Sequence, residues 1–172
     1  MIKKIISGGL PGVELAALHA AIKLDIPHEG WTYKRLKTEN NVLPEKFNVR
    51  EIVNQSYLGR LEKNIASSDG TVILTYGQLI RGSKAIKEVA DKHNKPYLLF
   101  DLNECTHGHV VSAIRKWMDN HKLEKIFFTG SKPIASTNLH EEVIKIIEGV
   151  CQVEREYQKH LRFQEKDDPD KF

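Results

Sequence analysis

Cysteine and long apolar runs are scarce in this chain of 172 residues. Its two cysteines, Cys105 and Cys151, are too few for a disulfide framework and suit a reducing compartment. No apolar run approaches the roughly 20 residues of a membrane-spanning helix, and the first residues lack the apolar segment of a signal peptide. We therefore expect a protein that neither depends on disulfides nor enters a membrane, and we expect a cytoplasmic location.

Charge of one sign is not concentrated anywhere in the sequence. Lysine and arginine number 26 against 23 aspartates and glutamates, and the formal net charge is +3. Lysine and glutamate are scattered along the predicted helices, so a nucleic-acid partner is not expected. The length and the ordinary hydrophobic content of 40% suit one globular domain. We expect this domain to span residues 1–153, followed by a charged, partly disordered extension over residues 154–172 that begins as a frayed helix.

Short apolar runs alternate with helical patterns along the chain. The runs that predict strands are residues 5–6, 71–75, 97–100 and 126–129, and residues 28–33 form a short strand or an extended loop. The helical patterns cover residues 13–24, 56–66, 82–93, 109–121 and 138–153, whereas residues 34–50 form a long polar connection. This alternation predicts an α/β fold: a mostly parallel sheet of about five strands with helices on both faces.

The apolar residues of the helical patterns predict which helix faces are buried. In the second helix the inner face is expected to carry Leu58, Leu61 and Ile65. In the fourth helix Trp117 lies in the apolar stripe. It is therefore expected in the core or at an interface and not in a ligand site.

A glycine-rich turn joins the first strand to the first helix. Gly8 and Gly9 follow the apolar pair Ile5-Ile6, and Gly12 precedes the helix. A turn of this kind leaves backbone N–H groups unpaired at the positive end of a helix, which favours a bound anion. We expect these amides to face outward and to be open. The G-G-x-x-G spacing matches neither the dinucleotide fingerprint nor the P-loop, and the alternative is a tight turn without a ligand.

Four strand-to-helix turns are expected at one edge of the sheet. Right-handed crossovers bring together the turns at residues 8–12, 76–83, 101–109 and 130–138, at the edge where open α/β sheets bind ligands. Glycines and serines of these turns would donate to an anion. Lys34 would supply charge from a basic connection, which could equally be a solvated loop. The predicted ligand-binding residues are Ser7, Gly8, Gly9, Gly12, Lys34, Gly82, Ser83, Gly130 and Ser131.

Two segments near the N-terminus resemble those of a known family. They are Ile5-Ile6-Ser7-Gly8-Gly9-x-x-Gly12-Val13-Glu14-x-Ala16-Ala17-Leu18 and Ile26-Pro27-His28-x-Gly30-Trp31. They resemble the putative molybdenum carrier proteins, the circularly permuted YpsA-related branch of the SLOG superfamily. Further matches, within a resemblance that covers residues 2–150, are Lys34, Glu39, Tyr57-Leu58, Asn64, Ser68-Asp69-Gly70-Thr71-Val72-Ile73, Gly82-Ser83 and His93-x-Lys95-Pro96.

The resemblance implies a three-layer Rossmann-like fold, a homo-oligomer (dimer or tetramer) and a small anionic ligand at the converging turns. That ligand would be nucleotide-like or molybdenum-cofactor-like. The sequence departs from the family motif S-G-G-Q-T-G-V-D-R-A-A-L at four positions, where it has Leu10, Pro11, Glu14 and Leu15. The first two remove polar side chains, and loss of the arginine removes a bidentate partner for an anion. Glu14 keeps an acid in the first helical turn and would repel a bound phosphate.

The sequence does not favour a metal site or a hydrolase. Cys105, His107 and His109 combine thiol and imidazole groups, but no second ligand pair is apparent, and no metal site is predicted. SLOG relatives that act as hydrolases carry P-G-G-x-G-T-x-x-E. The nearest local segment has Ile86 where the essential glutamate would fall, and no catalytic residues are predicted. The alternatives that stay open are a degenerate scaffold acting in protein interaction and a nucleotide-processing hydrolase.

Overall fold

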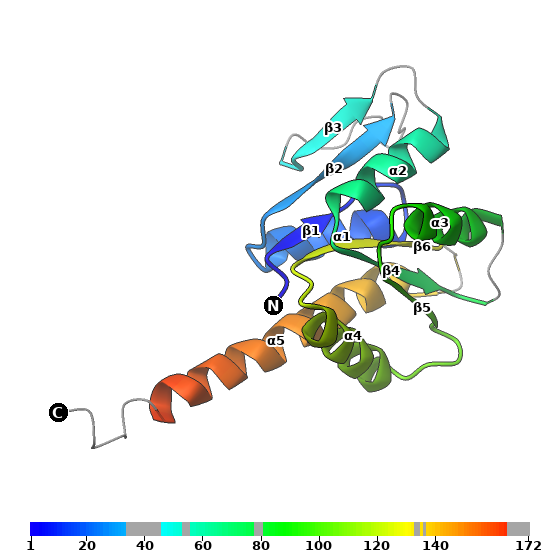
Figure 1. Cartoon of the computed structure of the whole chain (residues 1–172). Helices are drawn as coiled ribbons and strands as arrows, with labels where there is room; N and C mark the ends of the chain where they lie inside the picture. The colour runs from blue at the N-terminus through cyan, green and yellow to red at the C-terminus, as the bar shows by residue number, and fades with distance from the viewer. Residues whose placement is uncertain (34–45, 53–55, 78–80, 133–134, 136, 165–172) are drawn as a thin grey trace.

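The computed structural model describes residues 1–33, 46–52, 56–77, 81–132, 135 and 137–164. Six strands in this part of the chain form one sheet in the order β3-β2-β1-β6-β4-β5 (Figure 1). Every neighbouring pair of strands runs parallel. The strands are β1 Lys4–Ile6, β2 His28–Tyr33, β3 Val49–Ile52, β4 Gly70–Thr75, β5 Tyr97–Asp101 and β6 Lys125–Gly130. The expected parallel sheet is confirmed, with six strands in place of about five.

The additional strand is β3, an edge strand that begins at the end of the polar connection. Arg50 and Glu51 are exposed, and Ile52 is buried. This pattern shows neither strict alternation nor a continuous apolar run, which are the two signals that reveal a strand in a sequence. What defines β3 is its partner, because its four residues pair in parallel register with Gly30–Tyr33. Residues 28–33 are therefore a strand and not an extended loop.

Helices cover both faces of the sheet, as the sequence predicts. They are α1 Val13–Lys23, α2 Tyr57–Ser67, α3 Arg81–Lys92, α4 His107–His121 and α5 Leu139–Gln164. Helices α1, α4 and α5 pack on one face, and α2 and α3 pack on the other (Figure 1). The result is the three-layer arrangement of a Rossmann-like domain.

Helix α5 is longer than the sequence pattern indicates. It continues to Gln164, and its C-terminal part extends beyond the sheet (Figure 1). The expected extension therefore begins as helix, and residues 165–172 lie outside the described part of the chain. None of the helices within the described residues has the length and apolar content that crossing a bilayer requires.

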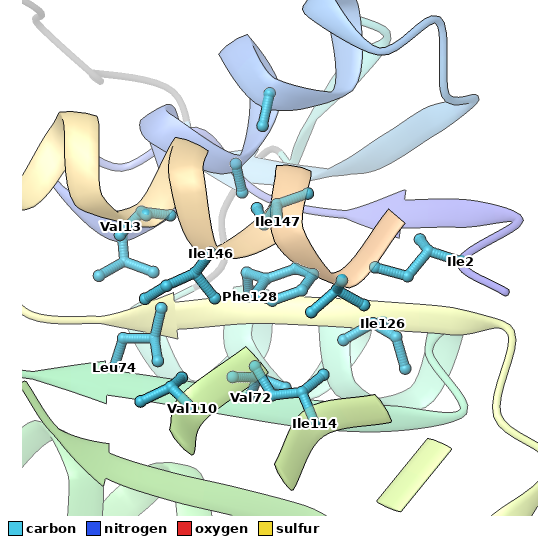
Figure 2. Close-up of a cluster of buried hydrophobic side chains, with 14 of the residues drawn as sticks. Ile2, Val13, Val72, Leu74, Val110, Ile114, Ile126, Phe128, Ile146 and Ile147 are labelled. Atoms are coloured by element: carbon cyan, nitrogen blue, oxygen red, sulfur yellow. The ribbon is translucent and has the colours of Figure 1, made fainter. Parts of the chain in front are cut away.

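Alternating side chains of the central strands build one core on each face. Ile126 and Phe128 of β6 point into the larger core, beneath α1, α4 and α5, whereas Phe127 points into the smaller core beneath α2 and α3. The continuous apolar runs in the sequence reflect this burial on both faces. Trp117 belongs to the larger core, as expected. The members of that core labelled in Figure 2 are Ile2, Val13, Val72, Leu74, Val110, Ile114, Ile126, Phe128, Ile146 and Ile147.

The expected inner face of α2 is correct at two positions and wrong at one. Leu61 and Ile65 are fully buried, but Leu58 is 52% exposed. In this first part of α2 the side chain that turns inward is Arg60, which is fully buried. The inward position that the apolar pattern assigns to Leu58 is therefore occupied by Arg60.

A pair of histidines links α1 to α5. Nδ1 of His19 lies 2.9 Å from Nε2 of His140 in a hydrogen bond, and the ring of His19 packs on Phe47 with 5.4 Å between centroids. Burial in the first place, and then the positive charges of His140 and Lys46, lower the pKa of His19. Protonation of His19, at this contact between α1 and α5, is therefore less favourable in the folded protein than in the unfolded chain.

This histidine makes stability depend on pH. In the unfolded chain His19 is protonated near pH 6.5, whereas in the folded protein it is protonated only at lower pH. Protonation therefore favours the unfolded state, and the free energy of unfolding is expected to fall as the pH is lowered from 7 to 5. His19→Gln should flatten this dependence, whereas His121→Gln, which changes an exposed histidine of α4, should leave it unchanged. Urea denaturation at pH 7, 6 and 5 measures the effect. Identical pH profiles for His19→Gln and the unsubstituted protein would contradict it.

Candidate functional site

The strand order reverses between β1 and β6, and two turns meet there. From β1 the sheet continues through β2 and β3 on one side, whereas β6, β4 and β5 lie on the other. Gly12, in the turn after β1, has a φ of 104°, and a Cβ atom at this residue would lie 2.2 Å from the carbonyl oxygen of Ser131. The amide of Val13 donates to the same oxygen (3.2 Å). The structure thus joins the glycine turn to the turn after β6, at the place where open parallel sheets bind ligands.

The carboxylate of Glu14 lies at the centre of the glycine turn. It comes from the first turn of α1, and the residue is 3% exposed. Its Oε2 accepts hydrogen bonds from the backbone amides of Gly8 (3.2 Å) and Leu10 (3.4 Å). The amide of Gly9 donates to Ser7 Oγ (3.1 Å), and this hydroxyl donates to the carbonyl oxygen of Glu14 (2.8 Å). The turn therefore folds its amides around atoms of the protein itself.

Arg60 of α2 and Thr129 of β6 complete the surroundings of this carboxylate. Arg60 forms a bidentate ion pair with it, Nη1 to Oε2 at 2.7 Å and Nη2 to Oε1 at 3.1 Å. The hydroxyl of Thr129 donates to Oε1 (3.0 Å). Both charged side chains are out of water, so each depends on the other for compensation. The amides of Gly8 and Leu10, the guanidinium of Arg60 and the hydroxyl of Thr129 are termed the carboxylate cradle.

The short first strand lets helices from opposite faces of the sheet meet in this cradle. β1 ends at Ile6, whereas its neighbour β2 continues further. Beyond that point the side-chain amide of Asn64 replaces a strand, because it accepts from the amide of Trp31 (2.8 Å) and donates to the carbonyl of Trp31 (2.9 Å). Arg60 lies one helical turn before Asn64 on the same side of α2. It therefore reaches the carboxylate on α1 past the end of β1.

The expectation that the first glycine pair offers open amides is wrong. The amides of Gly8, Gly9 and Leu10 all donate to protein oxygens. The sequence predicts that Glu14 repels a phosphate bound nearby, but in the structure its carboxylate occupies that position itself. Spacing could not reveal the pairing, since Arg60 is 46 residues away along the chain. The available signal was a glutamate among apolar residues at the positive end of a helix.

The remaining predicted ligand residues lie in the turn after β6, at the start of α3 or outside the described part of the chain. Gly130, with a φ of 148°, is the last residue of β6, and Ser131 follows it. Ser131 Oγ accepts a hydrogen bond from the backbone amide of Tyr76, in the turn after β4 (3.2 Å). Gly82 and Ser83 lie in the first turn of α3, which follows β4. Lys34 lies outside the described residues. Contact of these residues with a ligand stays a prediction.

Side chains also fix the turns that follow β4 and β5. The Tyr76 hydroxyl donates to Glu142 of α5. Burial first, and then the hydrogen bond and the charge of Glu142, raise the pKa of Tyr76 to about 12, so the phenol stays protonated at neutral pH. Asp101 Oδ1 accepts the amides of Gly77 (2.8 Å) and Asn103 (3.0 Å). These turns at the carboxyl edge are therefore held by internal contacts.

The thiol and imidazoles near the start of α4 do not gather into a metal centre. His107 and His109 are exposed in the first turn of α4, where Thr106 caps the helix by accepting the amide of His109 (3.4 Å). Within the described ranges of the chain, no three His, Cys, Asp or Glu side chains are placed to hold a metal ion.

Comparison with known proteins shows the family of this chain. Residues 5–151 match the model of the circularly permutated YpsA SLOG family. The chain belongs to that family. Among solved structures it is similar to the crystal structure of a putative molybdenum carrier protein from Syntrophus aciditrophicus, with 32% sequence identity and a TM-score of 0.80, over 87% of this chain and 94% of that chain. A search of curated proteins gives no match.

The family assignment includes every part of the candidate site. The matched residues 5–151 contain the glycine turn, Arg60 and Thr129. The cradle therefore lies within the part of this chain that matches the family. The Rossmann-like fold that the resemblance implies is confirmed by the parallel sheet and by the solved relative.

The buried ion pair is open to a direct stability test. We expect Arg60→Met to lower the free energy of unfolding by about 3–5 kcal/mol, because it leaves the Glu14 carboxylate buried without its counter-charge. Lys92→Met is the matched control, since it removes a charge from the exposed pair of Lys92 with Glu62, and exposed pairs contribute little. Urea denaturation measures both variants. If Arg60→Met lowers the free energy of unfolding no more than Lys92→Met does, Glu14 does not depend on Arg60 for compensation of its charge.

Proposed function

We propose that this protein binds a small anionic ligand, nucleotide-like or molybdenum-cofactor-like, at the carboxyl edge of its sheet. Membership of the YpsA-related SLOG family supports this class of ligand, as does the similarity to a protein named as a putative molybdenum carrier. The strand-order reversal between β1 and β6 supports the location. The proposal is one of binding, and it includes no catalytic step.

The observation that carries the proposal is the position of Ser131 and Lys132, which are termed the outer rim. They follow β6 directly, and the backbone of Lys132 packs against Gly12 of the glycine turn, where a Cβ atom would lie 2.9 Å from the Cα atom of Lys132. Lys132 is exposed. The Ser131 hydroxyl accepts one hydrogen bond and still has its proton to donate. An ammonium and a hydroxyl together suit a phosphate or a molybdate.

The occupied cradle supports binding at the outer rim and not deeper in the turn. The inner donors are bonded to Glu14. A second anion about 4 Å from this carboxylate would be repelled by about 4 kcal/mol at an effective dielectric constant of 20. At the outer rim the repulsion is smaller, because the distance from the carboxylate is greater and its charge is balanced by that of Arg60. The first turn of α3, with Gly82 and Ser83, adds backbone amides that have no partner within the helix.

A second candidate function is a scaffold that acts in protein interaction. The filled cradle favours it, together with Leu10 and Pro11, which put apolar side chains in the turn. Such a protein would bind no small anion at this edge, and its homo-oligomer or a protein partner would carry the function. The homo-oligomer and the cytoplasmic location are part of the proposal under either candidate.

Removal of the rim charge distinguishes the two candidates. We expect Lys132→Ala to weaken binding of molybdate, a nucleoside monophosphate or molybdopterin by roughly tenfold, the effect of losing one charge-assisted contact. Lys125→Ala is the matched control, because Lys125 is exposed at the opposite end of the same strand. Isothermal titration calorimetry at low salt measures the affinities.

The measured affinities distinguish ligand binding at the outer rim from the scaffold function. Binding that is weakened in Lys132→Ala and unchanged in Lys125→Ala supports the outer rim. Equal affinities in both variants would overturn this location for the ligand. If none of the three probes binds the unsubstituted protein, the scaffold is the better account.

A further inference from the structure

The carboxylate cradle has the donor set of an oxyanion-binding site. A guanidinium, two backbone amides and a hydroxyl converge on the two oxygens of one carboxylate. These are the groups with which proteins bind free carboxylates, phosphates and reaction oxyanions. The occupant in this structure is a side chain of the same chain, Glu14. The Glu14 carboxylate therefore occupies the position that a bound anion would have in such a site.

The cradle is built closely around its occupant. A Cβ atom at Gly8 would lie 2.2 Å from Nη1 of Arg60 and 3.0 Å from Oε2 of Glu14. Only a glycine lets the guanidinium and the carboxylate approach the turn this closely. Arg60 is 0% exposed, so water does not compete for these hydrogen bonds and the local dielectric constant is low. Such an environment binds an anion of one size and penalises an empty site.

We propose that the carboxylate cradle is an oxyanion-binding site with the Glu14 carboxylate as its resident ligand. In the intact protein this side chain keeps free phosphate, molybdate and carboxylates out of the cradle. Once the carboxylate is removed, the cradle binds a small free carboxylate in its place. The inference depends on the cradle alone and is independent of what the outer rim binds.

Glu14→Ala tests the proposal, because the substitution deletes a methylene and a carboxylate, the heavy atoms of acetate. In chloride we expect the unfolding temperature to fall by roughly 10 °C, since Arg60 loses its counter-charge. Acetate at about one hundred times its Kd should raise it again by roughly 5–10 °C. Formate lacks the methyl group and propionate is one methylene too long, so both should restore less than acetate.

Three controls separate a built site from a general salt effect. Glu14→Gln fills the cradle with a side chain of the same size, and it should not respond to acetate. The double variant Glu14→Ala/Arg60→Met lacks the guanidinium, and its response should also disappear. The unsubstituted protein should unfold at the same temperature in acetate and in chloride. Responses of these controls equal to that of Glu14→Ala would overturn the proposal.

The test holds even if Glu14→Ala is unfolded in chloride. The readout is then the folded protein recovered after dialysis from urea into acetate or into chloride of equal ionic strength. Recovery in acetate alone supports the site, and equal recovery or failure in both solutions overturns it. These results do not depend on Lys132, so a failure of the cradle proposal and a failure of ligand binding at the outer rim are distinguishable.

Discussion

An ion pair between helices on opposite faces of the sheet holds the candidate site together. Glu14 comes from α1 and Arg60 from α2, and they meet because β1 ends after three residues. Taking both charges out of water costs free energy that the pair alone does not recover. The amides of Gly8 and Leu10 and the hydroxyl of Thr129 offset this cost by completing the hydrogen bonds of the carboxylate. The conformation of the glycine turn and the position of α2 therefore depend on one another.

The glycine turn surrounds a carboxylate of the protein and not a free anion. A glycine-rich turn before a helix is often a place where a ligand's phosphate meets backbone amides. In this member of the SLOG family the amides meet a carboxylate of the chain, and the glycine at position 8 is needed because Arg60 and the backbone carbonyl of Trp31 approach it so closely. The proposed ligand site therefore lies further out, at the turn after β6 and the start of α3. The glycines of the inner turn shape the surroundings of the Glu14 carboxylate.

The sequence predicts the fold well, because each central strand is apolar on both faces and each helix carries an apolar stripe. It misses β3, whose exposed Arg50 and Glu51 hide the strand until β2 is present as a partner. It places the glycine turn correctly but not its occupant. That occupant depends on Arg60 and on Thr129, which is 115 residues from Glu14. A buried arginine in a helix looks the same in a sequence as a solvated one, so long-range polar contacts of this kind require the structure.

The most direct test of the central claim is a crystal structure of the unsubstituted protein soaked in sodium molybdate, with anomalous data collected at the molybdenum absorption edge. The account predicts that Glu14 Oε2 stays hydrogen-bonded to the amides of Gly8 and Leu10, with no molybdenum peak inside the cradle. A molybdenum peak between these amides and Arg60, with the Glu14 side chain displaced, would contradict it.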